Sequence, residues 1–326
     1  MSVDDESSSG WQLTESDPGV FTELLKTLGV PLIVDDLYSL DSESLAALQP
    51  LHAFIFLFKW LPSSQNESAP PSGGEYDPDF AGFFAHQVVN NACATLAVLN
   101  ALGNIPSLTV GSQLNELLNF TVGMDAQTRG LVITSSDWLR EAHNALSPPH
   151  AFSLDGLGLP RKSEDAYHFV VYLPVMGALY ELDGLKEHPV THGPCDGLDE
   201  GWVKKAREVI ERRISTYPEG SLEFSLLALR NDPLPLYQSQ LSHARTLGDT
   251  NTIADLVSKI ADENAKRERW AFENSLRRHN HVGLVHALLL ALAKKGALSD
   301  ARESAKKMMT ERIEMKKAKG EDMDED

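Results

Sequence analysis

The chain has 326 residues, an apolar fraction of 42% and a formal net charge of −18. This size allows one large domain with a smaller one, or two domains, and the apolar fraction is sufficient for a packed core. Because such an acidic surface repels phosphate groups, we expect no nucleic-acid partner. Two cysteines form no disulfide framework, and the first ten residues are acidic and polar, unlike a signal peptide. We therefore expect an intracellular protein with reduced thiols.

We expect residues 1–10 to be disordered. A mixed pattern of helices and strands follows them. Asp17 as N-cap and Pro18 at the first helical position predict a helix. The apolar run 52–61 predicts a fully buried strand, and the Pro, Ser and Gly residues of 62–79 predict a flexible surface loop. The apolar stripe of the predicted helix consists of Phe21, Leu24, Leu25 and Leu28.

Helical patterns with short polar breaks then cover 112–147, and a long loop is expected at 146–166. Residues 167–185 predict a β-hairpin, 201–220 a helix and 222–232 a closing strand. We therefore predict a mixed domain over 11–232.

Only helical patterns follow, and they divide the rest of the chain into a helical extension at 233–318 and an acidic tail at 319–326. Leu284, Leu288 and Leu292 form an apolar stripe, and Ser299 is a candidate N-cap for the last helix. The apolar stretch 282–293 is too short to span a bilayer and contains a histidine, so we expect no membrane partner.

Cys93 lies where a polar run gives way to the helical pattern of 93–103, with Asn90 and Asn91 as candidate caps. A cysteine is nucleophilic as the thiolate, which a helix N-terminus and a nearby histidine both favour. The alternative is a packing role, because free cysteine is among the most buried residue types.

The hairpin at 167–185 offers a histidine and a carboxylate. A turn at 174–177 would place His168 directly opposite Asp183, where a carboxylate fixes the imidazole tautomer. Such a cross-strand pair can also be purely structural. Gln87 is a candidate oxyanion donor beside the backbone N–H of Cys93, or else a solvated loop residue.

Five segments resemble, in order, the ubiquitin C-terminal hydrolase family of cysteine deubiquitinases: ESDPGVFTELL, FIFLFKW, QVVNNACATLAVLN, DAYHFVVYLPVMGALYELDGL and EGSLEFSLLAL. The likeness is strongest to the long, proteasome-associated branch with a helical extension. It implies the family's α/β fold, a central β-sheet flanked by helices with a knotted backbone, extended by C-terminal helices.

The resemblance also implies the roles of the site residues. Cys93 is the nucleophile, His168 the general base and acid, Asp183 the residue that orients His168, and Gln87 an oxyanion-hole amide. The implied reaction is hydrolysis of the peptide or isopeptide bond after the C-terminal glycine of ubiquitin, with no metal or organic cofactor. The alternative is a catalytically silent scaffold of the same fold that binds ubiquitin or a receptor.

The extension resembles the family's segment for binding a proteasomal ubiquitin receptor, which implies a place in cytoplasm and nucleus with the proteasome. His281 stands where the family usually has Tyr, and Gly283 where Pro is common. Candidate partner-binding residues are Arg278, His279, Asn280, Leu284 and Leu288. The alternative is that the leucines only pack their helix against its neighbours.

Overall fold

The computed structural model describes residues 9–59, 73–147, 167–195, 200–217, 224–279 and 281–318. The predicted loop beyond residue 147, the acidic tail, most of the predicted disordered start and Asn280 lie outside these ranges. Contacts divide the chain into two units, the first of which runs to Arg278 and the second from His279. In the described part, no helix has the length and apolar character needed to cross a membrane.

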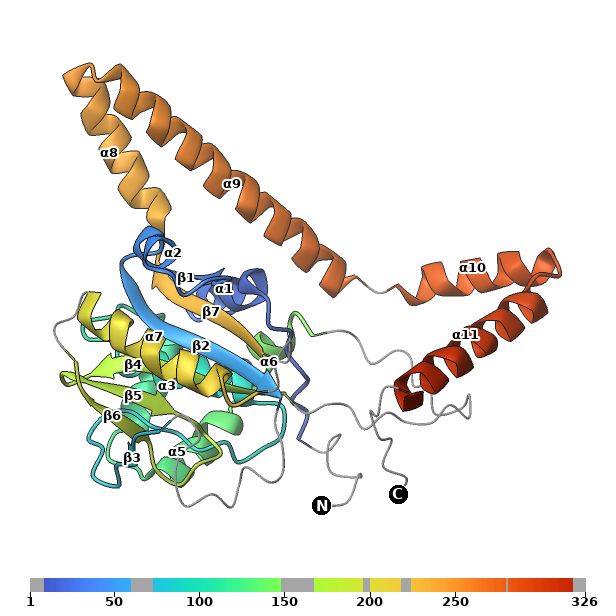
Figure 1. The fold of residues 1–326 in the computed structure, drawn as a ribbon, viewed down its shortest axis with the longest axis horizontal. Helices are drawn as coiled ribbons and strands as arrows, with labels where there is room; N and C mark the ends of the chain where they lie inside the picture. Colours follow the sequence, from blue (N-terminus) through green and yellow to red (C-terminus); the bar gives the residue numbers. More distant parts are fainter. Residues whose placement is uncertain are drawn as a thin grey trace. The chain divides into compact units, whose positions relative to one another are not determined.

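An antiparallel sheet forms the centre of the first unit (Figure 1). Its strands pair in the order β1-β7-β2-β4-β5-β6-β3, so β7, from the end of the domain sequence, lies between β1 and β2 from its start. The strands are β1 (Leu32–Asp36), β2 (Leu51–Lys59), β3 (Glu75–Tyr76), β4 (Tyr167–Val175), β5 (Ala178–Leu182), β6 (Val190–Pro194) and β7 (Phe224–Asn231).

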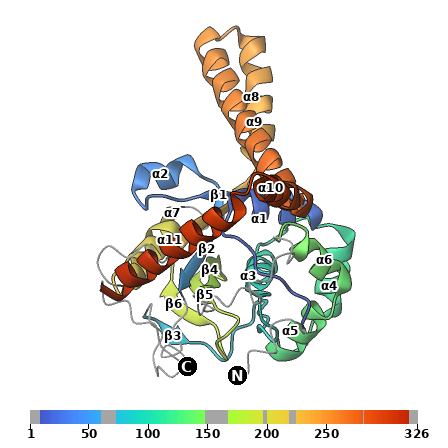
Figure 2. The same ribbon diagram turned by 90° about the vertical axis from the view of Figure 1, so that its right-hand side faces the viewer.

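Helices cover both faces of the sheet (Figure 2). On one side the sheet shares a hydrophobic cluster with α1 (Pro18–Thr27), α3 (Cys93–Leu102), α4 (Ser112–Phe120), α5 (Ala126–Thr134) and α6 (Asp137–Asn144). The other packs against α2 (Ser42–Ala47) and α7 (Glu200–Ile214). The predicted sheet with flanking helices is therefore confirmed.

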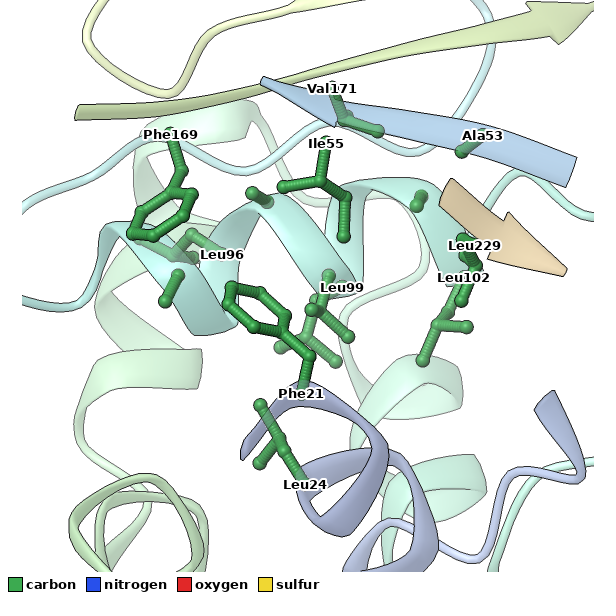
Figure 3. Close-up of a cluster of buried hydrophobic side chains, with 14 of the residues drawn as sticks. Phe21, Leu24, Ala53, Ile55, Leu96, Leu99, Leu102, Phe169, Val171 and Leu229 are labelled. Carbon is green, nitrogen blue, oxygen red and sulfur yellow. The ribbon is translucent and has the colours of Figure 1, made fainter. Parts of the chain in front are cut away.

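Side-chain alternation along the strands divides the core between these faces. Phe169 and Val171 point to α1 and α3, while Val170 and Tyr172 belong to the cluster that includes α7. Figure 3 shows the first cluster, where Phe21 of α1 lies against α3 beneath the strands. All ten residues of α3 are buried, so this helix is a fixed internal element.

Local signals place several elements where the sequence predicts them. Asp17 caps α1 by accepting from the Val20 N–H at 3.0 Å, with Pro18 as the first helical residue. The predicted strand is confirmed as β2, with Trp60 and Leu61 outside the described residues. It is largely rather than fully buried, because His52, Leu57 and Lys59 are half-buried. The loop at 62–79 needs a correction, because Glu75–Tyr76 pairs with β6.

A helical hairpin of α8 (Pro233–Leu247) and α9 (Thr250–Arg278) continues the first unit. The predicted division at residue 232 falls at the N-cap of α8, whereas contacts keep the chain together to Arg278. The reason is that α9 returns to α1. Trp270 is buried against Gly19, and Asn274 Nδ2 donates to the Gly19 carbonyl at 3.0 Å.

Charged contacts also bind α9 to the first unit. Lys266 Nζ lies 2.8 Å from Asp35 Oδ1, whose second oxygen accepts from Arg230 Nε at 2.7 Å. Arg277 bridges Glu15 and Asp17, at 3.0 Å from each.

The second unit contains α10 (Val282–Lys294) and α11 (Leu298–Ala318), which contact each other. The last helix begins one residue before Ser299, so Ser299 is not its N-cap. Leu284 and Leu288 of α10 are 58% and 56% exposed. The predicted apolar stripe is thus accessible within this unit.

Candidate active site

Cys93 is the first residue of α3 and is buried. The predicted asparagine cap is wrong, because Ala92 is the N-cap and no side chain caps the helix. Asn91 instead adopts a left-handed conformation (φ 66°) and its Nδ2 donates to the Trp11 carbonyl at 3.2 Å. The N-terminal amides of α3 thus have no side-chain acceptor from a cap, and they favour negative charge at this position.

His168 and Asp183 are hydrogen-bonded partners, as predicted. His168 Nε2 lies 2.6 Å from Asp183 Oδ1, and both side chains are buried. Asp183 Oδ1 also accepts from the Leu185 N–H at 2.9 Å, which fixes the carboxylate beside its own turn.

The strand register behind this pair differs from the predicted one by two residues. The hairpin turns at Met176 and Gly177, whose φ values of 49° and 82° are typical of a type I′ turn. Val171 therefore pairs with Leu182, whereas the predicted register would pair it with Tyr180. On its other side, His168 pairs with Phe58 of β2. An even shift keeps residues on the same face, so Asp183, just past β5, still reaches the imidazole.

Electrostatics favour a charged pair. Burial alone would lower the pKa of His168, but the Asp183 carboxylate and contact with Cys93 raise it to about 9. Burial would raise the pKa of Asp183, but His168 and the Leu185 N–H hold it below its ordinary value. The thiol, imidazole and carboxylate thus come together from α3, β4 and the end of β5.

Gln87 lies beside the same turn. Its backbone N–H donates to the Gly184 carbonyl at 2.8 Å, directly after Asp183. A Cβ on Gly184 would lie 3.1 Å from the Gln87 nitrogen, so a side chain there would crowd this contact. Gln87 Oε1 is buried and has no hydrogen-bond partner among the described residues. A buried amide atom in this state has hydrogen-bonding capacity left for a ligand.

A second cluster, formed by Phe58, Arg213 and Glu181, lies beside His168 and was not predicted from the sequence. Phe58 packs edge-on against the imidazole with ring centroids 5.8 Å apart. The Arg213 guanidinium of α7 lies 4.1 Å from the Phe58 ring centroid and donates to Glu181 Oε1 at 2.6 Å. The helical pattern at 201–220 indicates a buried face, but the pairing of Arg213 depends on strand register.

Two residues of the same chemical types as the site residues, His86 and Cys195, have different surroundings. The ring of His86 bonds to the Glu187 carbonyl at 3.0 Å, and Cys195 is half-buried. Arg278 pairs with Glu23 at 2.8 Å, and His279 is exposed. Within the described ranges, His, Cys, Asp and Glu side chains form no group of three suited to a metal ion.

A thiol at a helix start, an imidazole and a carboxylate on this fold define a cysteine peptidase. A family model described as ubiquitin carboxyl-terminal hydrolase, family 1, matches residues 11–215. A second, described as ubiquitin carboxyl-terminal hydrolases, matches residues 253–298. The chain belongs to the ubiquitin carboxyl-terminal hydrolase family, which confirms the family predicted from its motifs.

Similar proteins cover nearly the whole chain. Ubiquitin carboxyl-terminal hydrolase ubh-4 of Caenorhabditis elegans is 39% identical over 298 residues, which are 89% of this chain and 90% of that protein. Ubiquitin carboxyl-terminal hydrolase 2 of Schizosaccharomyces pombe is 36% identical over 302 residues, 91% of this chain and 96% of that protein.

A solved structure is similar in both sequence and fold. The crystal structure of Trichinella spiralis UCH37 bound to ubiquitin vinyl methyl ester has a TM-score of 0.65 and 35% sequence identity. The match covers 80% of this chain and 99% of that one.

Proposed function

We propose that this chain is a deubiquitinase that hydrolyses the peptide or isopeptide bond after the C-terminal glycine of ubiquitin. The observation that carries the proposal is the buried His168–Asp183 pair with Cys93 as a further partner of the imidazole. The similar Trichinella protein was crystallised with ubiquitin vinyl methyl ester, which supports ubiquitin as the substrate.

The first half of the reaction is acylation of Cys93. Because Nε2 of His168 faces Asp183, Nδ1 is the nitrogen left for the thiol proton. The thiolate attacks the carbonyl carbon of the terminal glycine, and a C–S bond forms as the carbonyl becomes an oxyanion. His168 then gives its proton to the leaving amine as the C–N bond breaks, which leaves a thioester on Cys93.

Deacylation reverses these roles. His168 takes a proton from water, whose oxygen attacks the thioester carbonyl, and the sulfur departs to restore the resting pair. The backbone N–H of Cys93 and the side-chain amide of Gln87 donate to the oxyanion in both halves. The bond from the Gln87 backbone N–H to the Gly184 carbonyl supports this role, because it holds Gln87 beside Asp183.

The helical extension serves, in this proposal, to recruit the enzyme to a proteasomal ubiquitin receptor, which places it with the proteasome in cytoplasm and nucleus. The exposed leucines of α10, Leu284 and Leu288, support a protein-binding role. The match of the second family model to residues 253–298 includes these leucines.

Hydrolysis of a fluorogenic ubiquitin C-terminal amide tests the activity. We expect turnover by the unaltered chain, none by Cys93→Ala, and unaltered turnover by Cys195→Ala, because Cys195 lies outside the site. Ubiquitin vinyl methyl ester should add one ubiquitin to the unaltered chain and to Cys195→Ala only. An unaltered chain that binds ubiquitin but neither turns over nor labels would establish the silent scaffold instead.

A further inference from the structure

Two hydrogen bonds hold the chain on either side of Cys93. On the N-terminal side, Asn91 Nδ2 donates to the Trp11 carbonyl at 3.2 Å. On the C-terminal side, Thr95 Oγ1 lies 2.7 Å from Nδ1 of His143. Both bonds lead to segments far away in the sequence, so the start of α3 is held from outside the helix.

Trp11 and His143, the two outside partners, also hold each other. Their ring centroids lie 4.8 Å apart in an edge-on arrangement, and both side chains are buried. Trp11 Nε1 donates to the Thr134 carbonyl at 3.2 Å. His143 Nε2 lies 2.7 Å from the Gln12 carbonyl oxygen and 3.0 Å from Thr14 Oγ1. The pair is therefore fixed to α5, α6 and the segment before α1.

The hydrogen-bond partners define the tautomer of His143. A carbonyl oxygen only accepts, so Nε2 carries the hydrogen and donates to Gln12. Nδ1 is then an acceptor, and the Thr95 hydroxyl donates to it. Burial lowers the pKa of His143 to about 4, which agrees with a neutral ring at physiological pH. His143 therefore accepts from Thr95 of α3 at Nδ1 and donates to the Gln12 carbonyl at Nε2.

Asn91 matters because of its backbone. Its φ of 66° lies in the left-handed region, which asparagine tolerates better than most residues. Ala92, which follows, cannot cap α3 with its side chain. The direction in which the chain enters the helix thus depends on the bond from Asn91 to Trp11 rather than on a local cap.

We propose that Asn91 and Thr95, held by the buried Trp11–His143 pair, are positioning residues that set the orientation of Cys93 toward His168. The proposal rests on the proposed function only because turnover of a ubiquitin substrate is one of the two quantities measured to test it. None of the four residues acts on the substrate; they fix the turn that carries the sulfur. A small displacement of a reacting atom is enough to cost a large factor in rate.

Thr95→Val tests the proposal, because it keeps the side-chain shape and removes the hydroxyl donor. We expect kcat for the fluorogenic ubiquitin amide to fall by about tenfold or more while KM changes little. Alkylation of Cys93 by iodoacetamide, without ubiquitin, should slow in parallel. Thr95→Ser keeps the hydroxyl and should restore both rates.

Asn91→Gly is a second variant that keeps the left-handed backbone and removes the donor to Trp11. It should lower kcat and the alkylation rate in the same way. Thr121→Val is the matched control, because Thr121 is as buried as Thr95 and its hydroxyl donates only within its own turn, to the Leu118 carbonyl. It should lose stability without losing either rate.

The proposal is overturned if Thr95→Val and Asn91→Gly unfold at lower temperature but keep the kcat and alkylation rate of the unaltered chain. That result would assign them a purely structural role, like that of Thr121. Failure of the proposed function is a different outcome: the unaltered chain would not hydrolyse the ubiquitin amide, while alkylation of Cys93 would still report its positioning.

Discussion

Arg213 of α7 and Glu181 of β5 form an ion pair of 2.6 Å in which each side chain is only 4% exposed. Arg213 Nη1 also donates to the Tyr172 hydroxyl at 2.9 Å. Glu181 lies two residues before Asp183, and its charge raises the pKa of that carboxyl, as a like charge must. A compensated Glu181 is thus part of what keeps the Asp183 carboxylate beside His168.

Arg213→Met should destabilise the fold strongly, because it removes the guanidinium that balances the buried Glu181 charge. Breaking a buried pair in this way costs about 3–5 kcal/mol in the free energy of unfolding. The double variant Glu181→Leu with Arg213→Met removes both charges and should recover most of this loss. Urea unfolding of the single and double variants measures the difference. Equal losses in both would show that packing, not the uncompensated charge, causes the effect.

Asp183→Asn should lower kcat by about 10²-fold or more, because the imidazole loses the partner that fixes its tautomer. The carboxylate raises the pKa of His168, so its loss lowers that pKa. The alkaline limb of the profile of kcat/KM against pH should therefore move to lower pH. A titration of activity from neutral to alkaline pH checks this shift. An unchanged limb would assign it to another group.

His168 should also make stability depend on pH in the alkaline range. Its pKa is raised from 6.5 to about 9 in the folded chain, so the folded state holds the proton more tightly than the unfolded state does. This contribution is complete below the unfolded pKa and is lost as pH rises toward 9. The free energy of unfolding of the unaltered chain should therefore fall over this window relative to that of His168→Gln. A constant difference would contradict the paired imidazolium.

His143 should act in the opposite direction. Burial lowers its pKa to about 4, so the unfolded chain takes up a proton first as pH falls below 6.5. Its neutral form therefore contributes stability above pH 6.5 that is lost toward pH 4. His143→Gln keeps a side-chain amide near the Gln12 carbonyl and does not titrate. Its unfolding free energy should fall less between pH 6.5 and 4 than that of the unaltered chain, as measured by urea unfolding.

The contact of Gly19 with Trp270 predicts a coupled pair. A Cβ on Gly19 would lie 2.8 Å from Cγ of Trp270, so Gly19→Ala should cost about 1–3 kcal/mol through overpacking. Trp270→Ala should cost about 3–5 kcal/mol by leaving a cavity. The double variant should lose less than the two losses added together, because the new methyl group no longer meets the indole. Additive losses in thermal or urea unfolding would mean that α9 does not press on α1 at this glycine.

Local rules predicted elements whose signals lie within a few residues. Asp17 and Pro18 start α1 because cap and first turn are adjacent, and β2 is apolar because both its faces are covered. The hairpin register was not predictable in the same way. Pro174 suggested an early turn, but the chain turns at Met176 and Gly177, where a non-glycine residue takes a positive φ.

The arrangement of the site depends on contacts between segments that are distant in the sequence, which local patterns do not specify. The proximity of Cys93, His168 and Asp183 was predictable, because an even register shift leaves each strand residue on the same face of the sheet. The asparagine cap failed because Asn91 bonds to Trp11, 80 residues earlier. Arg213 gave no sequence signal of its own, because a basic residue near a helix end is usually a solvated one.

The two-residue turn at Met176–Gly177 restricts which changes of length the hairpin can accept during evolution. Deleting or inserting one residue there would move Asp183 to the opposite face of β4, out of reach of His168, unless a bulge absorbed it. Adding or removing residues in pairs preserves the face. Related sequences that stay active should therefore keep residues that accept a positive φ in this turn, and should vary its length only by even steps.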